Sequence, residues 1–422
     1  MYTLNMFLKN IRNYSCLIPN KVCKRLFSLT FIKQVNTCVT NWELSKKYLL
    51  LNFSDHEEHK YHYLWLRDHC RCSKCYSNTT HARIQQTHKI PANIYPLHVS
   101  LNNGCLRIEW SDNHISIYSE SWLFQNHYNK SLEPFLISII SDIKCHYWGK
   151  EIQTNVPESI HFENVCKEKE DLLKLLENVA IYGFAIVKNT PTTLESVRTI
   201  SNLIGYPRKT FYGDVWLTTN RSEEDMDHAD LAYSNVALPC HTDGTYFLDS
   251  PGLQMFHCHE HTGTGGETVL VDGIGAAEKL KLTNPDAVEY LAKTWIPATY
   301  YEKDRCSKAL GPIIKINPYS KEIYQVRIND GDRDVLNCLS FDEIEKFYNH
   351  YIAFLDIIYS KEQEFRLKLT PGNLLIVNNW RVLHGRTSFT GKRSLSGCYI
   401  NMDDYLSTIR VLREHLRGIP SK

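Results

Sequence analysis

The chain has 422 residues, of which 43% are hydrophobic, enough for a sizeable core and for more than one domain. Its 48 basic residues balance 47 acidic ones, so it lacks the basic excess that a nucleic-acid-binding surface needs. It also has no run of about 18 uninterrupted apolar residues, so the sequence predicts no membrane-spanning helix.

The N-terminal segment, residues 1–35, differs in composition from the rest of the chain. It carries lysines and arginines among large apolar residues, and the first acidic residue is Glu43. A basic, acid-free, amphipathic leader is typical of a mitochondrial transit peptide, whereas a secretory signal needs an unbroken apolar stretch. The sequence therefore predicts a transit peptide over residues 1–35 and a mitochondrial matrix location. The alternative is a basic surface tail.

Residues 40–150 are predicted to form a small β-rich domain. Apolar and polar residues alternate over 102–119, with turn residues between them, which predicts a β-hairpin. A short helix is expected over residues 119–128, and a polar linker over residues 150–165 leads to the rest of the chain.

Three cysteines of this domain, Cys70, Cys72 and Cys75, lie within six residues. Three thiolates at this spacing can share one tetrahedral zinc ion, which then needs a fourth ligand. A site with four protein ligands is structural, because no coordination position stays open. Spacing alone leaves the fourth ligand undecided among His69, His81 and His114, and the alternative is a group of reduced thiols.

Residues 160–415 are predicted to form a second domain that is mostly β with flanking helices. Helical spacing of apolar residues predicts helices over 168–183 and 192–205, the second with a capping box at Thr192 and Glu195. A third helix, over 340–360, is expected to begin with a capping box of its own, at its first and fourth residues.

Many short strands separated by Gly and Pro favour a β-sandwich or jelly roll for this second domain. The expected strands are residues 184–188, 252–261, 265–273, 311–318, 321–329, 373–379 and 393–401.

Four polar residues of this domain form a recognisable chemical set. His241 and Asp243 are two residues apart, His384 follows a late, buried-looking strand, and Arg393 follows nine residues later. Two histidines and one carboxylate are the facial ligand set of non-haem Fe(II), which leaves coordination positions open. These positions can hold a 2-oxo acid and O2, and an arginine can pair with the far carboxylate of 2-oxoglutarate.

Seven segments carry a family resemblance: WLRDHCRCSKCYS, YGDVW, HTDGTYF, PGLQMFHC, GTGGETVLVDG, NNWRVLHGR and RSLSGCY. They resemble motifs of the γ-butyrobetaine hydroxylase and trimethyllysine dioxygenase family of 2-oxoglutarate oxygenases, and the resemblance covers essentially everything after the leader. It implies a double-stranded β-helix (jelly-roll) catalytic domain behind a zinc-binding N-terminal domain. It also implies Fe(II), 2-oxoglutarate as co-substrate, ascorbate as supporting reductant, structural zinc and a homodimer.

The resemblance implies roles for single residues. His241, Asp243 and His384 would ligate iron, and Arg393 would clamp 2-oxoglutarate. In the zinc site it selects His114 to join the three cysteines. The interval between His384 and Arg393 is shorter than in the butyrobetaine enzyme, which leaves the shape of the pocket open.

A trimethylammonium group cannot donate a hydrogen bond, so proteins hold it against aromatic faces. The family motifs supply four candidate rings, Tyr212, Trp216, Tyr233 and Tyr399. Trimethyllysine also has an α-ammonium and an α-carboxylate, for which Asp230 and Asn329 are the candidate partners.

The implied reaction is hydroxylation of N6,N6,N6-trimethyllysine at C3 to 3-hydroxytrimethyllysine, the first step of carnitine biosynthesis. The alternatives are γ-butyrobetaine hydroxylation to carnitine, an inactive zinc-dependent scaffold and a zinc hydrolase. The leader and Asp230 favour trimethyllysine over butyrobetaine. The complete ligand set argues against a scaffold, and Arg393 would have no evident task in a hydrolase.

Overall fold

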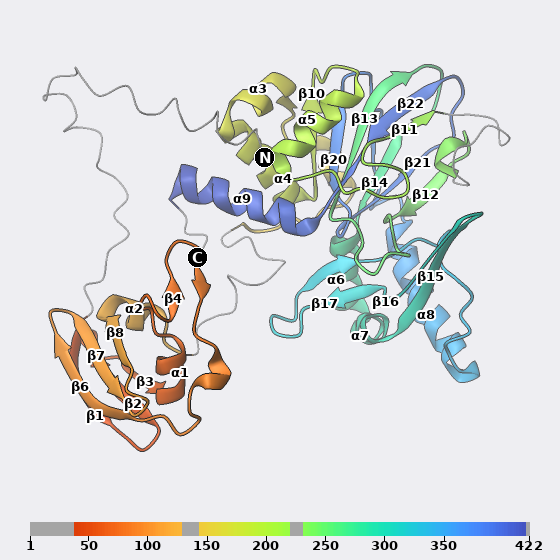
Figure 1. The fold of residues 1–422 in the computed structure, drawn as a ribbon. Helices are drawn as coiled ribbons and strands as arrows, with labels where there is room; N and C mark the ends of the chain where they lie inside the picture. The colour runs from red at the N-terminus through yellow and green to blue at the C-terminus, as the bar shows by residue number, and fades with distance from the viewer. Residues whose placement is uncertain (1–37, 129–142, 220–230, 419–422) are drawn as a thin grey trace, which may run out of the picture. The chain divides into compact units, whose positions relative to one another are not determined.

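The computed structural model describes residues 38–128, 143–219 and 231–418 (Figure 1). By its contacts the chain divides into two compact units, residues 1–130 and 131–422. The predicted transit peptide lies outside the described residues. Within the described part of the chain, no helix is both long and apolar enough to cross a membrane.

The first unit contains two three-stranded antiparallel sheets, β1–β2–β3 and β6–β7–β8, and a small pair, β4–β5. Every second residue of β2 and β7 is buried, as expected for strands with one face on a core. The predicted hairpin is part of β6–β8, and the predicted helix is α2, capped by Ser119. The elements are β1 (Val39–Leu44), β2 (Tyr48–Phe53), β3 (Glu58–His62), α1 (Tyr63–Asp68), β4 (Tyr76–Ser77), β5 (Ala82–Arg83), η1 (Thr87–Lys89), β6 (Pro96–Asn102), β7 (Cys105–Trp110), β8 (Ile115–Ser119) and α2 (Glu120–Gln125).

The second unit is built on two sheets, and the larger has the order β11-β22-β13-β20-β10-β9, with β23 also paired to β13. All these pairs are antiparallel except β9–β10. Its strands are β9 (Ile160–His161), β10 (Phe184–Lys188), β11 (Trp216–Thr219), β13 (Leu253–His261), β20 (Leu374–Asn378), β22 (Arg393–Gly397) and β23 (Tyr399–Ile400).

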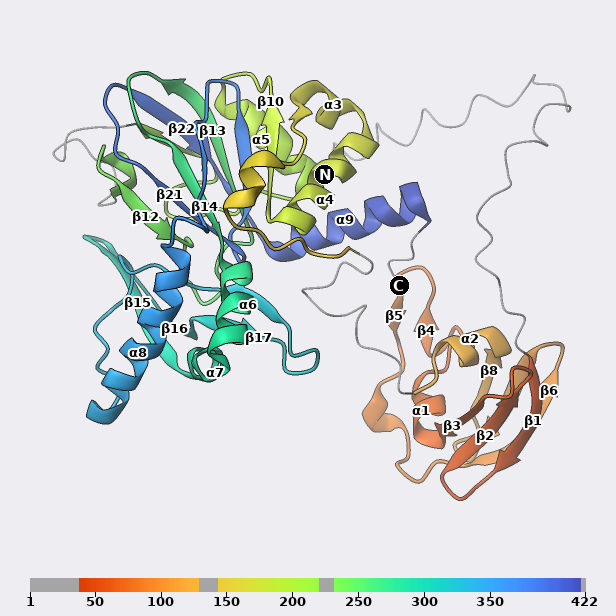
Figure 2. The ribbon, with the colours of Figure 1, turned by 180° about the vertical axis from the view of Figure 1, so that it is seen from behind.

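The smaller sheet has the order β12-β21-β14-β19. Apolar side chains of both sheets form one buried cluster, with Phe184 and Leu375 from the larger sheet and Leu270 and Val382 from the smaller. The two sheets therefore pack face to face, in a sandwich of the jelly-roll type that the sequence predicts (Figures 1 and 2). The strands of the smaller sheet are β12 (Leu238–His241), β14 (Thr268–Asp272), β19 (Phe365–Leu367) and β21 (Val382–Arg386).

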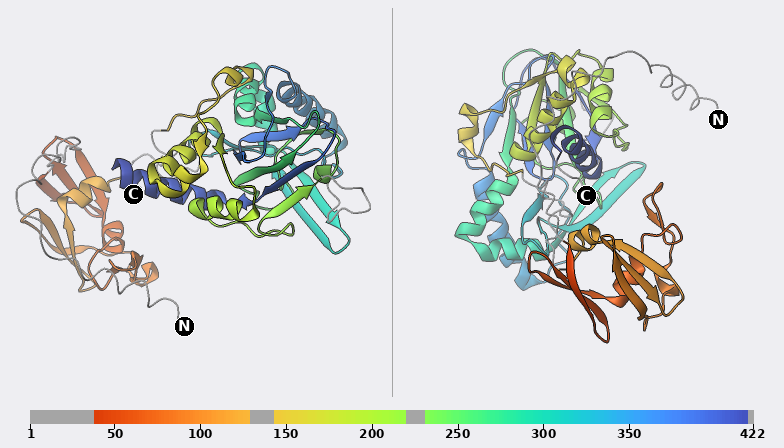
Figure 3. Two further views of the ribbon diagram at one scale, coloured as in Figure 1. Left: turned by 90° about the horizontal axis from the view of Figure 1, so that it is seen from above. Right: turned by 90° about the vertical axis from the view of Figure 1, so that its left-hand side faces the viewer.

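Helices and hairpins cover the outer faces of this sandwich (Figure 3). Helices α3, α4, α5 and α9 share a core with the larger sheet, whereas α6, α7 and α8 share one with the smaller sheet. The helices are η3 (Lys150–Thr154), α3 (Phe162–Lys167), α4 (Lys169–Tyr182), α5 (Leu194–Ile204), η5 (Leu231–Tyr233), α6 (Gly273–Thr283), α7 (Pro285–Lys293), α8 (Phe341–Ile358) and α9 (Met402–Arg417). Two hairpins complete the unit, β15 (Trp295–Glu302) with β16 (Arg305–Pro312) and β17 (Ile314–Ile316) with β18 (Ile323–Val326).

The structure differs from the sequence-based description in local details. The cap of α5 is Thr193, whose hydroxyl accepts a hydrogen bond from the Ser196 amide, and not Thr192. The capping box predicted for α8 is confirmed, at Ser340 and Glu343. The chain divides after residue 130, and Trp148 packs in the inner core of the second unit, whereas the sequence-based first domain ended at residue 150.

Candidate active site

Strand pairing brings together the two histidines of the predicted ligand set. β12 and β21 are antiparallel, and His241 and His384 are directly paired across them. Side chains of directly paired residues lie on the same face of a sheet. Asp243 follows two residues after His241, and its Oδ1 lies 3.1 Å from His241 Nε2 and 3.6 Å from His384 Nε2.

These distances suit three ligands of one metal ion. Two donors at about 2.1 Å from a metal and at right angles to each other lie about 3 Å apart. His241 Nδ1 lies 2.8 Å from the Pro239 carbonyl oxygen. A ring nitrogen beside a carbonyl carries a proton, so Nε2 is the nitrogen that can offer its lone pair to a metal when the metal replaces the proton shared with Asp243. The residues present therefore fit a facial Fe(II) site.

The charges of the set also suit a cation. Burial disfavours the charged form of Asp243, but the charge of His384 and the hydrogen bond with His241 hold the pKa of this carboxyl well below its usual range. Burial likewise opposes protonation of His241, but the hydrogen bond and charge of Asp243 outweigh it and raise the pKa of His241 to about 9. A metal ion can take the place of this proton between the carboxylate and the rings.

The loop after β12 is held by Asn379, which is buried. Its Oδ1 accepts from the Asp243 amide at 2.8 Å, and its Nδ2 donates to the Asp243 carbonyl at 3.0 Å. Gly244 has φ +70°, and a Cβ there would lie 2.7 Å from Pro251 Cδ. The backbone around Asp243 is therefore positioned independently of its carboxylate.

One pocket contains the predicted ligand set and most of the predicted substrate contacts. The four candidate cage rings line it, together with the ligand set and Arg393. The rings of Trp216 and Tyr399 have centroids 6.3 Å apart, and those of Phe256 and His384 5.0 Å apart. The lining residues are Tyr212, Trp216, Thr218, Ala232, Tyr233, Leu238, His241, Asp243, Gln254, Phe256, Thr268, His384, Gly385, Arg386, Arg393, Leu395 and Tyr399.

Two buried arginines make part of this pocket positive. Burial, with the nearby charge of Arg386, lowers the pKa of Arg393 to about 10, which leaves Arg393 a cation at neutral pH. Arg386 donates to the carbonyl oxygens of Ala232, Ser234 and Val236. Arg386 thus supports the segment that carries Tyr233, while the positive charge of both arginines favours an anion here.

The two other predicted substrate contacts are not part of this arrangement. Asp230 lies outside the described residues. Asn329 does not line the pocket, and its Nδ2 donates to Asp332 at 2.9 Å. Asp332 also accepts from the Thr245 hydroxyl at 2.8 Å, so Asn329 is connected to the loop after Asp243. A direct role for Asn329 at the substrate stays a prediction.

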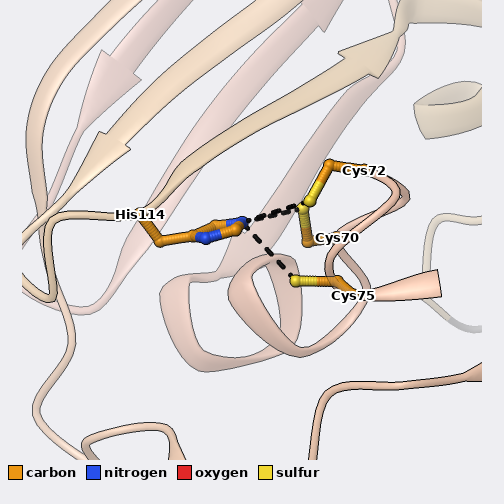
Figure 4. A group of neighbouring side chains, drawn as sticks. All are labelled: Cys70, Cys72, Cys75 and His114. Atoms are coloured by element: carbon orange, nitrogen blue, oxygen red, sulfur yellow. Dashed lines mark hydrogen bonds between the residues drawn. The ribbon is translucent and has the colours of Figure 1, made fainter.

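In the first unit, the three clustered cysteines converge on His114 (Figure 4). Its Nε2 lies 3.2 Å from Cys70 Sγ, 3.6 Å from Cys72 Sγ and 3.5 Å from Cys75 Sγ. Sulfur and nitrogen ligands at about 2.3 and 2.0 Å from a tetrahedral zinc lie about 3.5 Å apart, so the group fits this ion.

The other two candidate histidines lie elsewhere. His69 has its Nδ1 2.8 Å from the Trp65 carbonyl oxygen and stacks on the Trp65 ring, and His81 is exposed. Neither joins the cysteine group.

A third group of potential ligands, Glu57, His59 and His127, lies on the first unit. The two imidazole rings stack, with centroids 3.9 Å apart and planes inclined by only 14°. The lone pair of a ring nitrogen lies in the ring plane, so nearly parallel stacked rings do not direct their lone pairs at one ion. We therefore assign no metal to this group.

Three residues at the pocket were missed as site residues in the sequence. Gln254, Asn379 and Arg386 were quoted within family motifs but given no role. Only their presence in the family motifs could have indicated a role at the site. A single amide or arginine beside a strand is not part of a spacing pattern that predicts ligand binding.

Comparisons with known proteins agree with this geometry. Residues 145–399 match the model of the taurine catabolism dioxygenase TauD, TfdA family, and residues 41–124 match the γ-butyrobetaine hydroxylase-like N-terminal model. Mitochondrial trimethyllysine dioxygenase of Bos taurus is 37% identical over 393 residues, 91% of this chain and 89% of the relative. The Homo sapiens protein of that name is 37% identical over 388 residues, 87% and 89% of the two chains. Gamma-butyrobetaine dioxygenase of Homo sapiens is 30% identical over 371 residues, 86% and 94% of the two chains.

Proposed function

We propose that this chain, which belongs to the γ-butyrobetaine hydroxylase and trimethyllysine dioxygenase family of 2-oxoglutarate-dependent dioxygenases, hydroxylates C3 of N6,N6,N6-trimethyllysine. The reaction would consume O2 and 2-oxoglutarate and release succinate and CO2, as the first step of carnitine biosynthesis. The observation that carries the proposal is one pocket that joins a His–Asp–His set, a buried arginine and four aromatic rings. The greater identity to the trimethyllysine enzymes supports the choice of substrate.

In this proposal His241, Asp243 and His384 would hold Fe(II). When bound, the iron supplies the oxidative chemistry that turns a C–H bond into C–OH with 2-oxoglutarate and O2. The three side chains would leave coordination positions free for these two co-substrates. Arg393 pairs with the carboxylate of 2-oxoglutarate that is remote from the metal, through charge-assisted hydrogen bonds.

The pocket walls would position the substrate. The faces of Tyr212, Trp216, Tyr233 and Tyr399 attract a quaternary ammonium, which carries charge but no hydrogen-bond donor. Holding this end of the substrate selects the carbon that reaches the metal and keeps water away from the reacting bond. Asp230 remains the candidate partner for the α-ammonium, and Asn329 for the α-carboxylate.

The two candidate substrates differ in the distance between the quaternary nitrogen and the carbon that reacts. In trimethyllysine four bonds separate C3 from the quaternary nitrogen, whereas in γ-butyrobetaine only two bonds separate the reacting carbon from it. A cage at a given distance from the metal therefore presents the correct carbon of only one of them.

The decisive experiment offers both substrates to the purified chain without residues 1–35. Fe(II), ascorbate and 2-oxoglutarate are added, and succinate and the gain of one oxygen atom are followed by mass spectrometry. We expect trimethyllysine alone to gain oxygen. Oxygen gained by γ-butyrobetaine alone would overturn the substrate, and turnover of neither by the Fe(II)-loaded protein would overturn the activity.

Exchange of Arg393 for methionine should raise the KM for 2-oxoglutarate by more than about tenfold, because hydrogen bonds between charged groups contribute about 1.5–3 kcal/mol. Lys392→Met is the matched control, since Lys392 is the exposed cation next to Arg393. Initial rates against 2-oxoglutarate concentration measure both variants. Equal KM values for Arg393→Met and Lys392→Met would remove Arg393 from the co-substrate site.

We propose that Cys70, Cys72, Cys75 and His114 hold one structural zinc ion. Cys75→Ala should reduce zinc from one ion per chain to none, as measured by elemental analysis. It should also lower the melting temperature of the first unit, by about 4–8 °C for each kcal/mol of lost metal-binding energy. Cys38→Ala, at an exposed cysteine outside the group, is the control. Undiminished zinc in Cys75→Ala would contradict the assignment.

Ascorbate as supporting reductant, a mitochondrial matrix location and a homodimer complete the proposal. They are supported by the family and, for the location, by the mitochondrial relatives and the basic composition of residues 1–35.

A further inference from the structure

The carboxylate of Asp243 has two oxygens in different surroundings. Oδ1 faces the Nε2 atoms of both histidines, at 3.1 and 3.6 Å. Oδ2 accepts two hydrogen bonds, one from the Tyr399 hydroxyl at 2.7 Å and one from Gln254 Nε2 at 2.5 Å. The oxygen directed at the metal site and the oxygen turned away from it are therefore distinguished by their partners.

The pairing of two strands of the larger sheet places the two donors side by side. Gln254 on β13 and Tyr399 on β23 are directly paired antiparallel residues. Their side chains consequently leave the sheet on the same face, and both line the pocket. Tyr399 is 7% exposed and Gln254 2% exposed, so their hydrogen bonds to Asp243 are shielded from water.

The amide of Gln254 is oriented at a cost. Its Nε2 must face the carboxylate, because its Oε1 would meet another acceptor there. With this orientation Oε1 is buried and has no hydrogen-bond partner among the described residues. A buried acceptor without a partner is unfavourable for folding and is uncommon unless it serves another purpose. Placing a donor on Asp243 Oδ2 is such a purpose.

The geometry points to Tyr399 and Gln254 as a pair of positioning residues that hold Asp243 as a one-oxygen metal ligand. This inference rests on the proposed Fe(II) site but not on the identity of the substrate. A carboxylate that rotated to bind through both oxygens would occupy a further coordination position and leave fewer for 2-oxoglutarate and O2. The two donors oppose this rotation by satisfying Oδ2.

Tyr399 would then act in two ways. Its ring forms part of the proposed trimethylammonium cage, and its hydroxyl acts on the metal site through Asp243. Tyr399→Phe separates these actions, because it keeps the ring and removes the hydrogen bond.

The first test is metal binding by the apo-protein without substrate. We expect Tyr399→Phe to weaken Mn(II) binding about tenfold in a calorimetric titration, the usual effect of losing a hydrogen bond to a metal ligand. The visible spectrum of the Co(II)-loaded protein should also change, because it reports the number and geometry of the ligands. Tyr405→Phe is the matched control: it removes a buried tyrosine hydroxyl of the same unit that lies outside the pocket and donates to the Leu176 carbonyl oxygen.

The second test separates kcat from KM in the Fe(II)-loaded enzyme. With the substrate that the wild-type enzyme turns over, Tyr399→Phe should lower kcat and leave the substrate KM near the wild-type value. Gln254→Met, which removes the other donor at similar volume, should lower metal affinity in the same way. Because both donors act on one oxygen, the effects of the two substitutions should be non-additive in the double variant.

The outcomes distinguish this inference from the proposed function. Wild-type Mn(II) affinity and Co(II) spectrum in both Tyr399→Phe and Gln254→Met would overturn the positioning role. Weaker Mn(II) binding and a changed Co(II) spectrum would support it even if the wild-type enzyme hydroxylated neither trimethyllysine nor γ-butyrobetaine. If Tyr399→Phe does not fold, Gln254→Met decides the question alone.

Discussion

Replacement of Asp243 with alanine will abolish metal binding in the pocket and, with it, hydroxylation. Asp243 is the anionic member of the ligand set, and its Oδ1 faces the Nε2 atoms of His241 and His384. Loss of a hydrogen bond that supports a metal ligand costs about 10–100-fold in affinity or activity, so loss of the ligand itself should cost more than about 100-fold. Titration of the apo-protein with Mn(II) measures the affinity, and succinate release measures turnover.

The Asp243→Ala protein should remain folded, because Asn379 binds the backbone of residue 243 and not its carboxylate. Asp249→Ala is the matched control, since Asp249 is an exposed carboxylate on the following loop. We expect the control to keep wild-type metal affinity and turnover. Wild-type Mn(II) affinity in Asp243→Ala would show that the metal binds elsewhere.

The candidate ligands could be identified from the sequence because residue type itself carries the chemical signal. Histidine, aspartate and arginine in this order suggest iron and a 2-oxo acid whatever the local backbone does. The pairing of His241 with His384 could not be predicted in the same way. β12 has only four residues and contains Pro239, so it has no periodicity that marks it as a strand.

The fourth ligand of the cysteine group could not be predicted from residue spacing, for a different reason. Spacing within the chain brings the three thiols together but cannot choose among histidines. The choice depends on the turn between β7 and β8, where Asn113 has φ +62°, and on how that turn packs against the end of α1. Contacts between residues more than forty positions apart leave no local pattern.

The hydrogen bonds that Asp243 accepts from Gln254 and Tyr399 could not be predicted from the sequence for the same reason. Gln254 and Tyr399 become neighbours only because β13 pairs with β23. In the sequence Tyr399 was predicted as an aromatic surface for a cation. The contact of its hydroxyl with Asp243 follows from the sheet and not from the motif.

Asp272→Asn should destabilise the second unit more than any exposed substitution. Asp272 and Arg381 form a buried ion pair with side chains 0% and 3% exposed and an Nη2–Oδ2 distance of 2.7 Å. Asp272 also accepts from the Gly275 amide at the start of α6 and from the Trp148 amide. With asparagine at 272, the guanidinium stays buried without its counter-charge.

Removing one partner of a buried ion pair costs about 3–5 kcal/mol. For a unit of this size, the melting temperature should fall by about 2–4 °C for each kcal/mol. Denaturant unfolding of the metal-loaded protein, followed by a probe in the second unit, measures the change in free energy of unfolding.

The exposed pair of Glu289 and Lys293 supplies the control, because its side chains are 65% and 74% exposed and water screens their interaction, so Glu289→Gln should leave stability close to the wild-type value. A double variant, Asp272→Leu with Arg381→Met, tests the cause. If an uncompensated charge is responsible, the double variant should be more stable than Asp272→Asn, although it loses the cap of α6. It should not regain wild-type stability, because it also loses the hydrogen bonds that Arg381 donates to the carbonyl oxygens of His146 and Ile181. These bonds join the start of the second unit to the end of α4. A double variant no more stable than Asp272→Asn would mean that these hydrogen bonds, and not the buried charge, account for the stabilisation.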